Sequence, residues 1–161
     1  MVRPLLDEIV ANFNLQLQLY REMGEQSQRQ LAALQDSLSY EDLNPILDRR
    51  RQLLQDLDRL NARNREIQQE VLNKLDLKGF TLSQLKQRLD SDELAPLELL
   101  IDQLGLLLRR ITATDNQNQR LMAMRQVAGM EKKAPVANHI QVRQAYEQAV
   151  QQKKDRDSKS E

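Results

Sequence analysis

The stretch that decides the fold of this 161-residue chain is residues 4–38, PLLDEIVANFNLQLQLYREMGEQSQRQLAALQDSL. Counting from Leu6 in alternating steps of four and three residues reaches mostly apolar positions. Their period near 3.5 residues is typical of a helix packed along another helix. These positions are Leu6, Val10, Phe13, Leu17, Tyr20, Gly24, Ser27, Leu31, Leu34 and Leu38. The sequence therefore predicts a helix that begins near Pro4 and is about 50 Å long, with a bendable point at Gly24.

A second helix is predicted from near Asp42 or Pro45 to about Leu75. Its seam repeats the same spacing at Ile46, Arg50, Leu53, Leu57, Leu60, Asn64, Ile67 and Val71. Two of these positions are polar. We expect Arg50 to extend its charged head to solvent, and Asn64 to fix the register of pairing at some cost in stability.

The remaining helices are shorter or more apolar. Residues 76–80 predict a loop because they include Gly79, and Thr81 with Gln84 has the spacing of a capping box that opens a short helix over residues 82–90. A last long helix is predicted from Asp92 or Glu93, with Pro96 in its first turn. Its seam residues are Leu97, Ile101, Leu104, Leu108 and Ile111, after which the stripe fades at Asp115, Asn118 and Arg125.

This last helix is apolar on more than one side. Leu99, Leu100, Leu106 and Leu107 lie beside its seam, which predicts a segment buried between two partner helices. The predicted fold is therefore all-α: an elongated antiparallel bundle of three long helices plus one short helix. We expect a bundle domain over residues 1–130 and a flexible tail over residues 131–161.

The tail has a different composition. Residues 131–135, EKKAP, break the helical pattern, and residues 153–161 contain no apolar residue, so partial disorder is predicted. Between them Val136, Ile140, Tyr146 and Val150 form a weak amphipathic pattern, too short to hold a helix unaided.

Composition argues against an enzyme. The chain has no cysteine and a single histidine, His139, so it offers no thiolate, no histidine cluster for a metal and no nucleophile activated by a base. Its four glycines are scattered and form no phosphate-binding loop. We expect no catalytic residue, no metal and no cofactor.

Charge argues against nucleic acid as a partner. Lys and Arg number 24 and so do Asp and Glu, which gives no net charge. The run Arg49-Arg50-Arg51 is interleaved with Asp48 and Asp56, so no continuous basic stripe forms. No apolar run reaches the roughly 18 residues needed to span a bilayer, and we expect a cytoplasmic protein with no stable membrane insertion.

The segment from Leu121 onward is the part that suggests a partner. It carries several methionines beyond the bundle seams, and methionine recurs on surfaces that accept varied partner helices. Continued packing in the core is the alternative explanation, and the sequence leaves both open.

Four motifs, in order, resemble the FlgN-like flagellar export chaperones. They are Arg50-Arg51-Gln52-Leu53-Leu54, Leu60-Asn61-Ala62-Arg63, Gly79-Phe80-Thr81-Leu82-Ser83-Gln84-Leu85 and Asn118-Gln119-Arg120-Leu121-Met122. The resemblance covers about residues 5–125, and the extension after about residue 130 departs from it.

The resemblance implies a small cytoplasmic protein that binds hook-associated junction proteins and delivers them to the type III export gate. In that family the C-terminal region contacts substrate and gate, which places the protein-binding residues on the last helix and the tail. The candidates are Ile111, Leu121, Met122, Met124, Val127, Met130, Ile140 and Tyr146. Two other interpretations stay open: a FliT-like chaperone of the filament cap, and a coiled-coil adaptor that homodimerises through an exposed seam.

Overall fold

The computed structural model describes residues 2–36 and 40–127, without the side chains at positions 40–42, 126 and 127. Within these residues it has four helices and no strand: α1 (Arg3–Gln35), α2 (Tyr40–Leu75), α3 (Leu82–Leu85) and α4 (Ser91–Val127). The prediction of an all-α bundle of three long helices and one short helix is confirmed. The tail from residue 131, with its predicted disorder and weak helix, lies outside the described residues.

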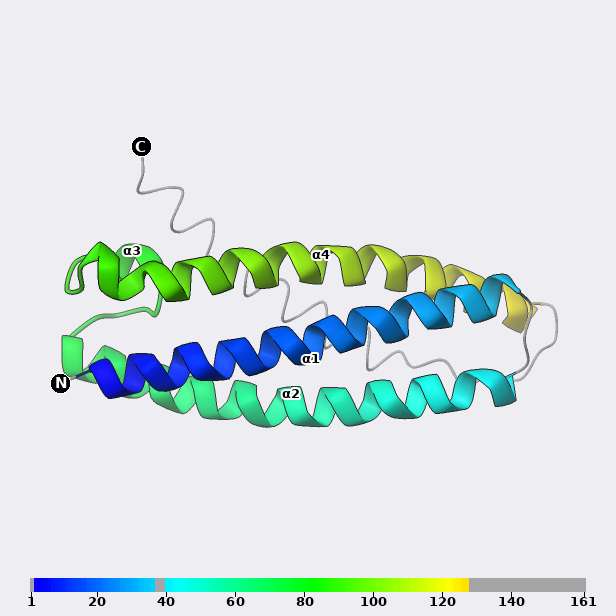
Figure 1. Ribbon diagram of the computed structural model, residues 1–161, viewed down its shortest axis with the longest axis horizontal. Coiled ribbons are helices and arrows are strands. Elements are labelled where there is room, and N and C mark those ends of the chain that lie inside the picture. The colour runs from blue at the N-terminus through cyan, green and yellow to red at the C-terminus, as the bar shows by residue number, and fades with distance from the viewer. Residues whose placement is uncertain (1, 37–39, 128–161) are drawn as a thin grey trace.

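The three long helices lie side by side in an elongated bundle (Figure 1). The chain runs along α1 from one end of the bundle to the other, returns along α2 and runs out again along α4, so α2 is antiparallel to both α1 and α4. Helix α1 packs against α2 and against α4, whereas the backbones of α2 and α4 do not approach each other closely in the described residues. The first helix is thus the common partner of the other two.

This central position explains a difference from the predicted seam of α1. Residues seven apart on the predicted line are buried, as at Leu6, Phe13, Tyr20, Ser27 and Leu34. A second line that the simple step pattern skipped is also buried, and it consists of Ile9, Gln16, Met23 and Gln30. A helix with partners on two sides needs a stripe wider than the narrow seam of a two-stranded coiled coil.

Local signals set most of the helix ends. Thr81 caps α3 by accepting a hydrogen bond from the backbone N–H of Gln84 at 3.2 Å, as its spacing predicted. The helix is shorter than the predicted 82–90, because only turns follow Leu85. Asp90 caps α4 by accepting from the N–H of Glu93 at 2.8 Å, so α4 begins earlier than predicted, at Ser91.

Two prolines lie further inside their helices than predicted. Helix α2 begins at Tyr40, and Pro45 is internal to it, as Pro96 is internal to α4. Each removes one backbone donor close to a helix start, where the ladder of hydrogen bonds is just beginning, so the helix continues through it.

The turn after α2 depends on Asp76 rather than on Gly79. Asp76 has a φ of 54°, the left-handed conformation that often ends a helix. The N–H of Leu77 then donates to the carbonyl of Leu72 at 3.0 Å, which closes the end of α2.

Among the described residues, the core consists of two apolar clusters. The larger one occupies the half of the bundle that holds the N-termini of α1 and α4, and it includes Ile9, Phe13, Leu57, Val71, Leu97 and Leu104. The smaller one lies at the other end and consists of Ala33, Leu34, Leu43, Leu47 and Met122.

A layer of buried polar side chains separates the two clusters. Arg50 of α2 is 2% exposed and forms a bidentate ion pair with Asp115 of α4. The Nη1–Oδ1 distance is 2.7 Å and the Nη2–Oδ2 distance is 2.6 Å. Ser27 of α1 donates to the same carboxylate at 2.7 Å, and Gln30 of α1 accepts from Arg50 at 2.8 Å. The expectation that the head of Arg50 would reach solvent is wrong, because a buried carboxylate lies opposite it.

The layer also includes Asn118, which donates to the backbone carbonyl of Ser27 at 3.1 Å. The positions where the α4 stripe was predicted to fade, Asp115, Asn118 and Arg125, are therefore buried seam positions. The seam continues to the end of α4 and changes from apolar to polar chemistry.

Candidate partner-binding surface

The outward face of α4 carries three of the large apolar side chains that are most exposed in the described residues. Leu99 is 59% exposed, Leu106 is 49% exposed and Met124 is 66% exposed. Successive helical residues turn by about 100°, so spacings of 7 and 18 residues bring all three to within about 20° of one line. The prediction that Leu99 and Leu106 would be buried between two partners is wrong, because α4 packs on α1 from one side only.

The structure divides the predicted binding residues into two groups. Ile111 and Met122 are each only 2% exposed and belong to the larger and the smaller core cluster. Met124 faces solvent, and Leu121 is half-buried against the smaller cluster. Val127 is the last residue of α4 and its side chain is not described, while Met130, Ile140 and Tyr146 lie outside the described residues.

The end of α4 is held firmly against α1. Arg125 is buried and donates from Nη2 to the carbonyl of Leu34 at 3.0 Å, at the C-terminal end of α1 where carbonyls lack helical partners. Met122 packs with Leu34 in the smaller cluster. Because these two side chains fix the rotation of α4, Met124 is directed outward.

The charges along α4 differ from those along α2. On α2, Arg49, Arg51, Arg59 and Arg63 each form an ion pair with a carboxylate. On α4, no ion pair joins Arg109, Arg110 or Arg120 to any described residue. The apolar line of α4 therefore runs beside arginines whose charge is not neutralised by a described carboxylate.

Two of the α2 pairs link it to α1. The hydrogen bond from Arg63 lowers the pKa of the Glu8 carboxyl, and the one from Arg49 lowers the pKa of Glu22. Both pairs are on the surface, where solvent screening makes such links weak. The arginine run of α2 was predicted to form a solvated face. This holds for Arg49 and Arg51 but not for the buried Arg50.

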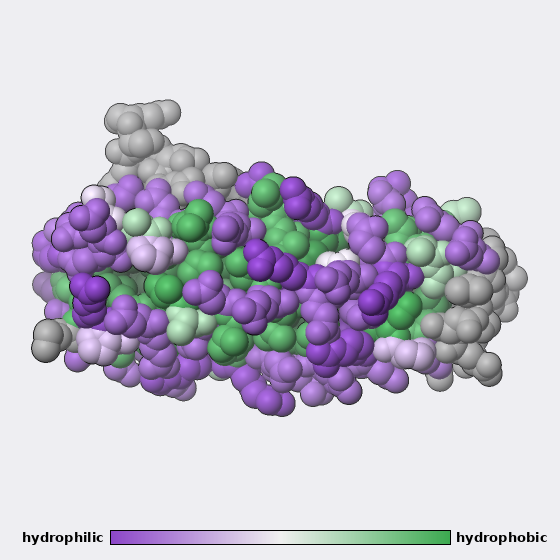
Figure 2. All heavy atoms as spheres, in the orientation of Figure 1, coloured by the Kyte–Doolittle hydropathy of each residue, from purple (hydrophilic) through white to green (hydrophobic). Residues whose placement is uncertain are grey.

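Figure 2 shows how apolar surface is distributed on the face where α1 and α4 meet. Apolar side chains show between hydrophilic ones along that junction and do not gather in one broad patch. No described helix is long and apolar enough to cross a membrane. The exposed face of α4 therefore offers apolar contacts flanked by positive charge, which suits the binding of another chain.

Comparison with family models decides the identity. The model described as FlgN protein matches residues 1–128 of the chain. The chain belongs to the FlgN family. Members of this family are flagellar type III export chaperones and not enzymes, so the resemblance read from the four motifs is confirmed. Searches of the curated proteins and of the solved structures returned no match.

The FlgN match spans all four helices and ends next to Val127, the last residue of α4. The motif Asn118-Gln119-Arg120-Leu121-Met122 lies in the part of α4 that packs on the end of α1, with Asn118 and Met122 buried and Arg120 exposed. In this FlgN chain the late motif thus combines packing residues with surface residues.

Sequence reasoning missed Leu99 and Leu106 as exposed residues of the FlgN bundle. A signal was present, since both fall off the seam that runs through Leu97, Leu104 and Ile111. The abundance of leucine concealed it, because a helix with leucines on every side is also what full burial would require.

Proposed function

We propose that this chain is a non-enzymatic chaperone of the cytoplasm that binds hook-associated proteins of the hook–filament junction and delivers them to the flagellar type III export gate. The observation that carries the proposal is the FlgN match over residues 1–128, which includes every described helix. The exposed apolar line of α4 supports it, because a chaperone of export substrates needs a surface that receives an apolar segment.

The proposed contacts with client or gate begin on α4 and continue into the tail. Among the described residues they are Leu121 and Met124, and further along the chain they are Val127, Met130, Ile140 and Tyr146. Ile111 and Met122 enter the proposal as core side chains that hold α4 in place. The proposal divides the chain into a bundle over residues 1–130 and a separate tail over residues 131–161.

The substitution Met124→Glu tests the client contact. A carboxylate on the exposed line should weaken binding of a purified hook-associated protein about tenfold, because it is desolvated without a partner. Gln119→Glu adds the same charge on another exposed face of α4 and should change affinity less than about twofold. Titration calorimetry measures both, and equal affinities would remove Met124 from the contact.

A companion substitution, Met122→Glu, separates binding from folding. It places a charge in the smaller core cluster, so the bundle should lose several kcal/mol of stability, on the order of the cost of an unpaired buried ion. Urea unfolding should distinguish this variant clearly from Met124→Glu. If Met122→Glu were as stable as the parent chain, Met122 would not be a core residue.

Ending the chain after Gly129 tests the gate contact. Because the described helices remain, client binding by the bundle should persist, whereas binding to the cytoplasmic domain of the export gate should fall. Unchanged gate binding would argue against a role for Ile140 and Tyr146.

The aligned line of Leu99, Leu106 and Met124 favours one other candidate, a coiled-coil adaptor that homodimerises. Sedimentation equilibrium discriminates between the two functions. A chaperone gives a defined complex with a hook-associated protein, whereas an adaptor gives a dimer that Leu106→Glu dissolves and binds no such client.

A further inference from the structure

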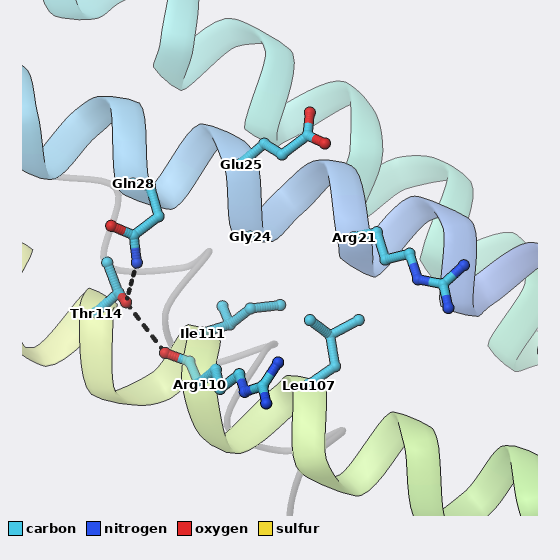
Figure 3. Close-up of a pocket in the computed structure, with 8 residues that line it drawn as sticks. All are labelled: Arg21, Gly24, Glu25, Gln28, Leu107, Arg110, Ile111 and Thr114. Carbon is cyan, nitrogen blue, oxygen red and sulfur yellow. Dashed lines mark hydrogen bonds between the residues drawn. The ribbon is translucent and has the colours of Figure 1, made fainter.

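A cavity of about 340 Å³ opens between α1 and α4 at Gly24. It is drawn in Figure 3, and we refer to it as the Gly24 notch. It lies beside the larger core cluster, just before the buried polar layer, and none of the contacts proposed for clients above lies in it. At one end Gln28 of α1 donates a hydrogen bond to Thr114 of α4 at 3.0 Å, which closes the space between the two helices.

The floor of the notch is apolar. A methyl group built at Gly24 would lie 3.5 Å from Cγ1 of Ile111 and 3.8 Å from Cδ1 of Leu107, both ordinary packing distances. The space beyond is what a side chain at this seam position would have filled. Since an aliphatic cavity of about 150 Å³ is enough to hold benzene, the notch has room for a leucine or methionine from another chain.

Glycine at this position does not interrupt the helix and is not needed for a close approach. Helix α1 runs unbroken from Arg3 to Gln35 and continues through Gly24. An added methyl group meets no backbone atom of α4, so no helix crossing requires glycine. The consequence of Gly24 is an opening in an otherwise filled seam.

The rim of the notch is basic. Arg21 and Arg110 line it from opposite helices, and neither forms an ion pair with a described residue. Glu25 also lines the notch, but Figure 3 shows its carboxylate on the side of α1 turned away from α4, whereas the guanidinium of Arg110 lies beside Leu107 and Ile111. Two cations thus flank an apolar hole, with half-exposed Leu106 next to it on α4.

We propose that the Gly24 notch binds an acidic amphipathic helix of a partner protein, which inserts one leucine or methionine and pairs its carboxylates with Arg21 and Arg110. Helix-in-groove recognition uses such apolar anchors, and arginine pairs well with carboxylates. The inference rests on the proposed function in one respect, that the chain receives partner helices, and it adds the location and the charge of one such contact.

Charge argues against the chain's own tail as the occupant. Residues 131–161 contain seven basic side chains and five acidic ones. Their first part, residues 131–152, contains three basic side chains and two acidic ones. A segment with a surplus of positive charge does not complement two arginines. A partner with a surplus of carboxylates does.

The test uses a labelled, designed amphipathic helix with one leucine flanked by glutamates, and a matched peptide with lysines in their place. Fluorescence anisotropy with the full chain should show binding of the acidic peptide, weakening with added salt, and at least about tenfold weaker binding of the basic one. Equal binding of the two peptides, or binding of neither, would overturn the proposal.

Three variants locate the contact. Gly24→Leu fills the notch, and Arg110→Glu reverses the rim charge without touching the core. Each substitution should therefore lower the affinity for the acidic peptide about tenfold. Arg29→Glu makes the same change on α1 near Glu22, away from the notch, and should have less than about a twofold effect. If Gly24→Leu fails to fold, Arg110→Glu and Arg29→Glu decide the matter alone, and equal effects of the two would refute the site.

Other occupants would be recognised in the same experiments. Tighter binding after truncation at Gly129 would show that the tail occupies the notch. A homodimer that Arg110→Glu dissolves would show a second copy there. A chain that binds hook-associated proteins but not the acidic peptide would refute the notch and leave the proposed function standing, and the reverse result would refute only the function.

Discussion

The two ends of the bundle are held together by different chemistry. In the half that contains the start of α1, leucines, isoleucines and aromatic side chains from all four helices meet in one large apolar cluster. Toward the other end, Arg50, Asp115 and Asn118 form a buried polar layer, and only a small apolar cluster lies beyond it. The apolar half gives stability. The polar layer requires one alignment of the three long helices, because the hydrogen bonds that it makes between helices can form at only one register.

The polar layer is not completely satisfied. Nε of Arg50 and Oδ1 of Asn118 are buried and form no hydrogen bond with any described group. A buried ion pair with unmet hydrogen-bonding groups stabilises less than apolar residues of the same size. The contrast between the two halves is therefore between stability and specificity, and substitutions can separate them.

The largest effect is expected from Asp115→Ala. Removing the carboxylate leaves Arg50 buried without its counter-charge, so the free energy of unfolding should fall by about 3–5 kcal/mol. Urea denaturation followed by circular dichroism measures the loss. The double variant Arg50→Met with Asp115→Leu should regain most of it, and a single variant within about 1 kcal/mol of the parent would mean that the layer is not tightly buried.

Leu57→Ala tests the apolar half. Leu57 is buried in the larger cluster, and its truncation should lower the free energy of unfolding by about 2–5 kcal/mol through lost contacts and a residual cavity. Leu106→Ala removes the same atoms from the outward face of α4 and should change stability by less than about 0.5 kcal/mol. Equal losses at both positions would contradict the orientation of the helices.

A smaller effect is expected from Asn64→Leu, at a polar site inside the apolar half. Asn64 is buried, accepts a hydrogen bond from Asn12 at 2.9 Å and donates one to Gln16 at 3.2 Å. Leucine would leave those amides unpaired and lower stability by about 1–3 kcal/mol. Asn73→Leu, at an exposed position of the same helix, is the matched control; a more stable Asn64→Leu variant would show that the asparagine serves register alone.

The smallest effect is expected at the end of α2, where Asp76 has a positive φ. Asp76→Gly should raise stability by about 0.5–1 kcal/mol, because glycine adopts this conformation without a Cβ clash. Asp76→Ala should lower it, since alanine lacks the polar side chain that helps aspartate tolerate the left-handed region. Thermal unfolding of the three chains gives the order, and a stabilised alanine variant would contradict the assigned conformation.

Sequence alone determined the number and order of the helices and the approximate length of the three long ones. A period near 3.5, the cap at Thr81 and a proline in the first turn of α1 are local properties. It also identified the family from four short motifs. For the proposed binding surface it pointed to the end of α4 and grouped Met122 with Met124. The rotation of α4 that separates these two side chains depends on packing against α1.

Only the tertiary structure decided where the polar seam residues point. An arginine at position 50 can reach solvent or turn inward, and the choice depends on Asp115, which lies 65 residues later on another helix. The exposure of Leu99 and Leu106 was decided in the same way, since leucine is equally compatible with either side of α4 until its partners are placed. Periodicity is fixed within each helix, whereas burial and charge pairing arise between helices.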